Sequence, residues 1–186
     1  MTMKKVTMMV IMLASTMATT FGQSFMTRTG KISFNATAPS SPEKIEAVNN
    51  EVANILDAKS GALVFQVPVK SFKFERELMQ EHFNENYMES DKFPRADFKG
   101  TITNVADVNF GKDGTYNAKV SGKMTMHGVT KDVNTSGTIT VQGNTIKAAA
   151  KFSLKLADYG INVPSVVADK VGKEARIALE STLSKK

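Results

Sequence analysis

The sequence predicts a mainly β protein, an antiparallel β-barrel of about eight strands with one or two amphipathic helices. From Leu63 onward, apolar residues recur at every second position, the pattern of strands with one buried face. Short segments containing glycine and polar residues separate these runs, as tight turns between antiparallel strands do. Because an open sheet of so many strands would expose its edges, we expect the sheet to be closed or nearly closed.

The first 22 residues are expected to be a cleaved secretory signal peptide, which leaves residues 23–186 as one domain. Lys4 and Lys5 precede an uncharged stretch rich in Met, Val, Ile and Leu, and Gly22 offers a small residue for cleavage. Serine and threonine dilute this stretch too much for a retained membrane anchor. The mature protein is therefore expected to be periplasmic or secreted.

After a first strand at residues 31–36, the chain predicts an amphipathic helix at residues 42–56. Ser41 is suited to cap the helix, Pro42 to occupy its first position and Gly61 to end the segment. The apolar residues at helical spacing are Ile45, Val48, Val52, Ile55 and Leu56.

The later strands are predicted from alternation. The apolar positions fall within residues 63–69, 98–102, 115–126, 133–141, 146–156 and 175–179, with turns at residues 111–114, 127–131 and 142–144. The clearest strand places Tyr116, Ala118, Val120, Met124 and Met126 on one face.

A second helix is expected between Phe74 and Pro94. Leu78, Met79, Phe83 and Tyr87 recur there at helical intervals. A helix inserted into a barrel must lay its apolar stripe on something, so this segment is expected to cover the barrel opening as a lid.

Composition excludes several kinds of function. There is no cysteine, so disulfides and thiol catalysis are absent. The formal net charge of +6 falls to +4 once Lys4 and Lys5 are removed, and the basic residues are scattered, so we expect no nucleic-acid partner.

Two histidines are the residues that most suggest chemistry. His82 and Glu85 share a helical face with Glu89, but a metal site needs about three or four protein ligands, and the other histidine, His127, lies in a predicted turn. No nucleophile motif is present. We therefore expect no catalytic residues, no metal and no cofactor. The alternative is a metal-binding or hydrolytic protein that uses His82, Glu85 and His127.

The predicted barrel interior is the more informative candidate site. An eight-stranded barrel is just wide enough either to be filled by side chains or to hold one ligand, and small inward residues such as Ala148 and Ala150 leave room. The candidate ligand-binding residues are Phe65, Val67, Leu78, Met79, Phe83, Phe98, Val120, Met124, Met126, Phe152 and Leu154. Candidate rim residues are His82, His127, Lys131 and Tyr159.

Three ordered motifs carry a resemblance to a known family. They are the His82 helix leading to KFP at 92–94 and to Phe98, the HGVTK turn at 127–131, and DYGI at 158–161 leading to Pro164. From Gly61 to the C-terminus, the chain resembles the YceI-like family of exported lipid-binding proteins. The motif residues carried over by position are His82, Phe93, Pro94, Phe98, His127, Gly128, Thr130, Lys131, Tyr159, Gly160 and Pro164.

The resemblance implies an extended, lipocalin-like barrel with a helix near its opening and no catalytic activity. It also implies that a polyisoprenoid or similar long-chain amphiphile, an isoprenoid or fatty lipid, occupies an internal tunnel. The sequence departs from the family at residues 42–56, where members have extended strands. The expected function is to sequester or carry this lipid; transient membrane contact and a homodimer are compatible with it. A stress-related or interaction barrel without a ligand is the remaining alternative.

Overall fold

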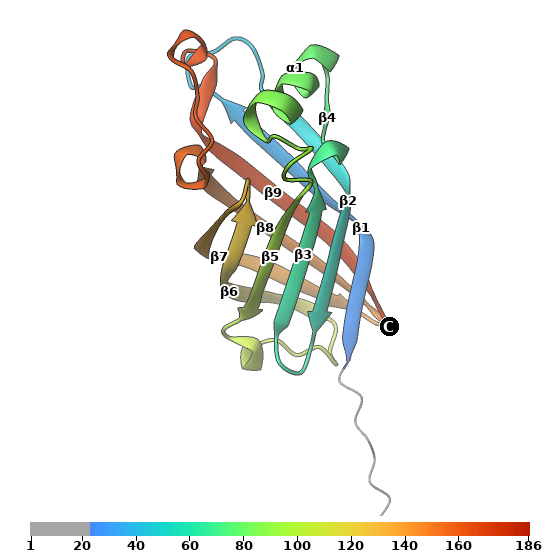
Figure 1. The fold of residues 1–186 in the computed structure, drawn as a ribbon. Coiled ribbons are helices and arrows are strands. Elements are labelled where there is room, and N and C mark those ends of the chain that lie inside the picture. The colour runs from blue at the N-terminus through green and yellow to red at the C-terminus, as the bar shows by residue number, and fades with distance from the viewer. Residues whose placement is uncertain (1–22) are drawn as a thin grey trace, which may run out of the picture.

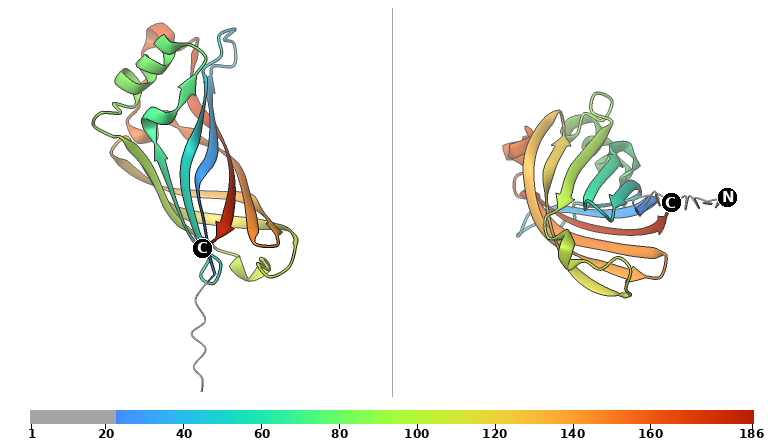
Figure 2. Two further views of the ribbon diagram at one scale, coloured as in Figure 1. Left: turned by 90° about the vertical axis from the view of Figure 1, so that its right-hand side faces the viewer. Right: turned by 90° about the horizontal axis from the view of Figure 1, so that it is seen from below.

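The computed structural model describes residues 23–186, so the predicted signal peptide lies outside the described residues. Eight long antiparallel strands follow one another around a closed barrel in the order β1-β9-β8-β7-β6-β5-β3-β2, and pairing of β2 with β1 closes the ring (Figures 1 and 2). The strands are β1 (Ser24–Thr37), β2 (Glu46–Asp57), β3 (Ala62–Pro68), β5 (Arg95–Ile102), β6 (Gly114–Met126), β7 (Val129–Gln142), β8 (Thr145–Lys155) and β9 (Val171–Lys185). The predicted barrel is confirmed.

Short elements complete the fold. A two-residue strand, β4 (Lys73–Phe74), pairs with β2 outside the ring. A single short α-helix, α1 (Glu77–His82), occurs among the described residues and continues into a π-helical turn at Phe83–Tyr87. Turns of 3-10 helix lie at Val69–Ser71, Val105–Asp107, Leu156–Tyr159 and Ser165–Val167. Within residues 23–186, α1 and the other helical turns are too short and too polar to cross a membrane.

The predicted helix at residues 42–56 is wrong, because this segment forms strand β2. Its buried residues are Ala47, Asn49, Val52, Asn54 and Leu56, which alternate except for one three-residue step. That step coincides with a shift in the β1–β2 register, where Gly30 pairs with Val52 but Ile32 pairs with Asn49. A β-bulge of this kind inserts one extra residue and breaks the period of two. The apparent departure from the family pattern therefore disappears.

The second predicted helix exists, but its apolar face differs from the predicted one. In the π-helical turn, Met88 N–H donates to Phe83 O at 2.9 Å. This wider turn buries Phe83 and Met88 against the barrel, while Leu78 is 62% exposed. Of the predicted stripe, Phe83 is buried and Tyr87 packs against the core, whereas Leu78 does not belong to the buried face.

The predicted alternation in β6 and β7 is confirmed. Ala118 and Ile139 are buried on the inner face, and the two strands pair continuously from Gly114–Val141 to Met126–Val129. The turn between them is only two residues long, with φ of 51° at His127 and 75° at Gly128. Positive φ at both central residues matches the twist of the adjoining strands, as in a type I′ turn.

The two ends of the barrel differ. At one end, beside the β2–β3 turn, Phe25 stacks on Phe110 with ring centroids 6.4 Å apart, and Ile102 and Val108 are buried. At the other end, α1 and the π-helical turn lie over the strands (Figure 1). We call residues 77–88, which comprise α1, the π-helical turn and Met88, the lid segment.

Candidate functional site

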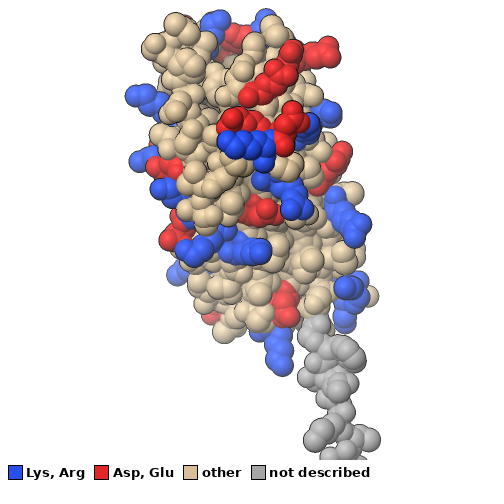
Figure 3. Space-filling view, in the orientation of Figure 1, with Lys and Arg blue, Asp and Glu red and all other residues tan. Residues whose placement is uncertain are grey.

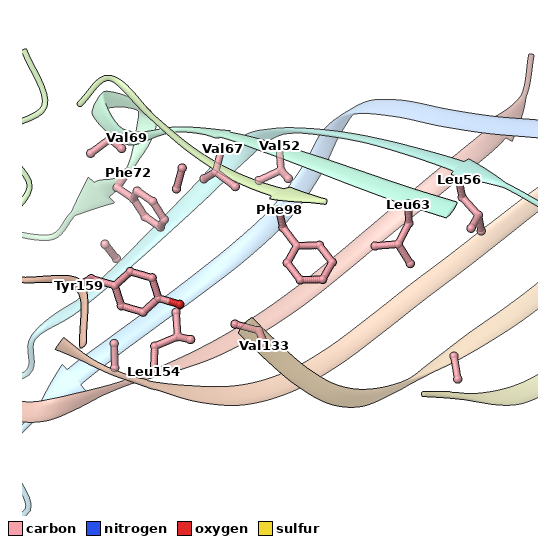
Figure 4. Close-up of a cluster of buried hydrophobic side chains, with 14 of the residues drawn as sticks. Val52, Leu56, Leu63, Val67, Val69, Phe72, Phe98, Val133, Leu154 and Tyr159 are labelled. Atoms are coloured by element: carbon pink, nitrogen blue, oxygen red, sulfur yellow. The ribbon is translucent and has the colours of Figure 1, made fainter. Parts of the chain in front are cut away.

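The barrel encloses a cavity of about 170 Å³ with an almost entirely apolar lining. The lining runs from Leu56 and Leu63, next to the β2–β3 turn, to Phe83 in the lid segment. Figure 4 shows the side chains of several strands converging on this space. The site is therefore a lengthwise channel inside the barrel rather than a cleft on its surface.

Nine of the eleven predicted ligand-binding residues line this cavity: Phe65, Val67, Phe83, Phe98, Val120, Met124, Met126, Phe152 and Leu154. Leu78 and Met79 do not, although Phe83 of the same predicted stripe does. The prediction missed Phe34, Phe72, Met88 and Asn54, all of which line the cavity. Phe34 could have been found from the alternation of Ile32, Phe34 and Ala36 in the first strand.

Four phenylalanines close the lid end of the cavity. The Phe83 ring lies 5.0 Å from Phe74, 5.5 Å from Phe72 and 5.7 Å from Phe34, measured between ring centroids. Tilted and edge-on aromatic pairs of this kind are each worth about 1 kcal/mol beyond their buried area. Phe83 is thus the central contact between the lid segment and the barrel.

Phe98 lies over a pair of glycines, one on its own strand and one on the next strand. Gly100 of β5 pairs with Gly122 of β6, and a Cβ added to either glycine would lie 2.7 Å from the Phe98 ring. The ring therefore occupies the space that side chains would otherwise fill. This arrangement holds a large apolar ring close to the backbone of the wall.

The predicted rim residue His127 binds two other segments of the chain. Its Nδ1 lies 3.0 Å from the Tyr159 carbonyl oxygen and its Nε2 lies 2.9 Å from Glu89 Oε2. The Phe93 ring packs edge-on against the imidazole, at 4.9 Å between centroids. We call His127, Glu89, Phe93 and Tyr159 the latch. It joins the β6–β7 turn to the end of the lid segment and to the turn after β8.

The latch brings together residues from all three motifs seen in the sequence. A Cβ on Gly128 would lie 2.7 Å from the Phe93 ring, and Gly160 has φ of 69°, a backbone conformation that favours glycine. These motif residues surround His127 and not the cavity. Their visible role is to hold the lid end of the barrel together.

The other predicted rim residues do not belong to the lining of the cavity. Tyr159 is only 2% exposed, and burial, with a smaller effect of Asp158, raises the pKa of its phenol. Lys131 is exposed on β7, where it pairs with Met124 of β6. His82 is exposed on α1, where its Nδ1 lies 2.9 Å from Asn86 Nδ2.

No metal centre can be built from the predicted ligands. Among residues 23–186, no three His, Cys, Asp or Glu side chains come together in a way that could hold a metal ion. His82, Glu85 and His127 are therefore not such a group, and both ring nitrogens of His127 already face hydrogen-bond partners.

A closed antiparallel barrel around an apolar channel, with a helical lid segment at one end, defines a lipocalin-like barrel with an internal apolar site. The chain belongs to the YceI-like domain family, whose model matches residues 3–183. Comparison with curated protein sequences gives no significant match.

Solved structures of similar fold come from several bacteria. A polyisoprenoid-binding domain from Saccharophagus degradans, implicated in plant cell wall breakdown, has a TM-score of 0.75 at 11% identity, covering 89% of this chain and 100% of that one. Burkholderia cenocepacia BcnA has a TM-score of 0.67 at 16% identity, covering 83% and 96%. The Campylobacter jejuni YceI protein has a TM-score of 0.55 at 14% identity, covering 76% and 86%. At these identities the likeness is one of fold.

Proposed function

We propose that this protein is an exported, non-catalytic lipid-binding protein that holds a polyisoprenoid or similar long-chain amphiphile inside its barrel. The observation that carries the proposal is the apolar channel, which extends along the barrel and is lined by residues of β1 to β3 and β5 to β9. Each CH₂ group buried in such a channel contributes about 0.8 kcal/mol. A long hydrocarbon tail therefore needs no special polar motif to bind tightly.

The size of the channel adds a condition. A cavity of about 170 Å³ is close to the engineered cavity of about 150 Å³ that accepts one benzene molecule. A long tail therefore requires wall side chains to move apart. Met88, Met124 and Met126 line the channel, and unbranched methionine side chains adapt readily to new shapes.

The lid segment supplies a route of entry. Helix α1 contains no buried residue, so this segment is held mainly through Phe83, Met88 and the contact between Glu89 and His127. Elements with few buried contacts open at low free-energy cost. Outward movement of the lid segment would withdraw Phe83 from the channel and admit a lipid tail.

Separate observations support the ligand class and the location. The Saccharophagus degradans domain of similar fold is a polyisoprenoid-binding domain, which favours this class of lipid. The charged start and apolar stretch of residues 1–22 support export to the periplasm or the outside of the cell. On the face shown in Figure 3, acidic and basic side chains are interspersed, as expected of a protein with no nucleic-acid partner.

Two exposed apolar side chains support a transient membrane contact during lipid exchange. Leu78 of α1 is 62% exposed, and Val166, in the turn before β9, is 84% exposed. Both lie at the lid end, where Glu43 pairs with Arg76 and Lys170 and so joins the two neighbourhoods. Weaker retention of a Leu78→Ser variant on lipid vesicles is the expected result.

Native mass spectrometry of the protein purified without detergent tests the proposal. We expect a stoichiometric long-chain lipid, whose mass identifies it after extraction. The narrow channel also favours one alternative, a barrel that works without a ligand. That alternative predicts that the protein is purified without lipid and takes up none when it is mixed with lipid vesicles. Such a result would overturn the proposal.

A further inference from the structure

A buried amide side chain, that of Asn54, belongs to the mostly apolar lining of the channel near the β2–β3 turn. Asn54 of β2 is 2% exposed and lines the cavity. Within residues 23–186, no donor lies within hydrogen-bonding distance of its Oδ1 atom. Leaving such a buried acceptor unpaired costs about 1–3 kcal/mol.

The surroundings of Asn54 are apolar on the β3 side, and its cross-strand partner on β1 is Thr27. Its cross-strand partner on β3 is Phe65, which in turn pairs with Phe98 on β5. Leu56, two residues further along β2, lines the end of the channel next to the β2–β3 turn. An apolar side chain would suit this position better than an amide if packing were its only role.

Asn49 shows what a structural asparagine looks like on the same strand. Asn49 is fully buried, its Nδ2 donates to Pro68 O at 2.8 Å, and its Oδ1 accepts from Glu51 N at 2.8 Å. This amide therefore fixes the backbone around the β-bulge. Asn54 satisfies no backbone group through its Oδ1 and so has no comparable role.

We propose that Asn54 binds the polar end of the lipid, a neutral group such as a hydroxyl. This polar end enters the channel first and lies near the β2–β3 turn, at the end opposite the lid segment. This inference rests on the proposed function. A hydroxyl both donates and accepts, so it pairs with the carboxamide in either orientation of the amide. The tail then extends past Phe65 and Phe98 toward the lid segment.

The polar end must be uncharged. The one ionisable residue along the channel is Asp97, whose carboxylate already accepts a hydrogen bond from Gln66 Nε2 at 3.2 Å. No lysine, arginine or histidine belongs to the lining formed by residues 23–186. A phosphate or carboxylate head would lose its hydration without gaining a counter-charge, which is strongly unfavourable.

The test compares decanol with decane as probes of lipid-free protein. We measure the ratio of their dissociation constants in the wild type and in Asn54→Leu by displacement of a fluorescent fatty probe. Comparing ratios between variants cancels the different hydration of the two ligands. We expect the substitution to weaken decanol relative to decane about tenfold, the effect of losing one buried hydrogen bond.

Ser181 provides the matched control. Its Oγ is also buried and unpaired, but Ser181 belongs to the wall of β9 and does not line the channel. Ser181→Ala removes an unpaired polar atom and should leave the decanol-to-decane ratio unchanged. Asn54→Val repeats the measurement if Asn54→Leu folds poorly.

The outcomes separate this inference from the proposed function. If both probes bind and the ratio is the same in wild type and Asn54→Leu, the role of Asn54 is wrong and the lipid site stands. If neither probe binds the wild type, the lipid site itself is wrong and the inference falls with it. A lower melting temperature of lipid-free Asn54→Leu would also count against the inference, by showing that Asn54 has a structural partner.

Discussion

His127 Nε2 donates a hydrogen bond to Glu89 Oε2 at 2.9 Å, and these two residues share an uncommon backbone conformation. Among the described residues they are the non-glycine residues with positive φ, 51° at His127 and 42° at Glu89. Such conformations cost free energy and persist where the surrounding structure imposes them. The side-chain contact therefore joins two strained turns that lie 38 residues apart in the chain.

Breaking this contact should loosen the lid segment. In Glu89→Ala, we expect a loss of about 1 kcal/mol in the free energy of unfolding, because the Glu89 side chain is 46% exposed and water competes for the bond. His127→Ala should cost more, because it also removes the contacts with the Tyr159 carbonyl oxygen and the Phe93 ring. Hydrogen exchange should become faster at the amides of residues 77–90. A double-mutant cycle isolates the pair, and purely additive losses would show that the two side chains are not coupled. His82→Ala, on the exposed face of α1, is the control.

Two turn glycines allow a comparison of backbone conformation with packing. Gly128 and Gly143 both have positive φ, 75° and 56°, but a Cβ on Gly128 would meet the Phe93 ring at 2.7 Å, whereas a Cβ on Gly143 meets nothing within 4 Å. Gly143→Ala should therefore cost about 1 kcal/mol for backbone strain alone. Gly128→Ala should cost about 2–3 kcal/mol, because the ring packed on His127 must also move. Denaturant unfolding of the two variants checks this, and equal losses would contradict it.

The strands that could be predicted are those whose inner faces are uniformly apolar. In β6, Ala118, Val120 and Met124 alternate with polar residues, and the structure places all three along the channel. β2 could not be predicted in this way, because its bulge shifts the period and two buried asparagines stand where apolar residues are expected. Val48 and Ile55, whose side chains point away from the barrel interior, supplied the other apolar positions of the apparent helical spacing.

The candidate site was predicted where it depends on alternation alone. Phe65 and Phe98 were found from their strands, but the contact of His127 with Glu89 joins distant segments and carries no local signal. Asn54 was hidden for a different reason. It lies within the predicted helix and outside its apolar stripe, and only the closure of β2 onto β1 places it inside the barrel.

Acid should weaken the ion pairs at the lid end. Lys170, followed by Arg76, holds the pKa of the Glu43 carboxyl below its ordinary value of 4.5. A carboxyl whose pKa is lowered on folding contributes stability above the unfolded pKa and loses it as the pH falls through the folded value. Glu43→Gln should therefore lower the melting temperature at neutral pH and make little difference at about pH 3.

Glu77→Gln is the control for this titration, because Glu77 takes part in no ion pair among residues 23–186. Its melting temperature should follow that of the wild type across the same pH range. A destabilisation by Glu43→Gln that persists unchanged in acid would show that packing of this side chain, and not its charge, holds the connection between β1 and β2.

A larger side chain on the wall of the channel distinguishes a barrel that holds a ligand from a barrel filled by its own side chains. Ala148 and Ala149 of β8 both border the channel, but the Ala148 side chain lies on the inner face and pairs with Ile139, whereas the Ala149 side chain is exposed on the outer face. In Ala148→Phe, the new ring should occupy much of the 170 Å³ cavity, abolish lipid uptake and change the unfolding free energy by less than about 1 kcal/mol. Ala149→Phe should bind lipid as the wild type does. Native mass spectrometry and denaturant unfolding measure both effects.

If Ala148→Phe keeps its lipid, the ligand lies elsewhere. If the variant instead loses about 1–3 kcal/mol of unfolding free energy, as an overpacked core does, the channel is not free space in the folded protein.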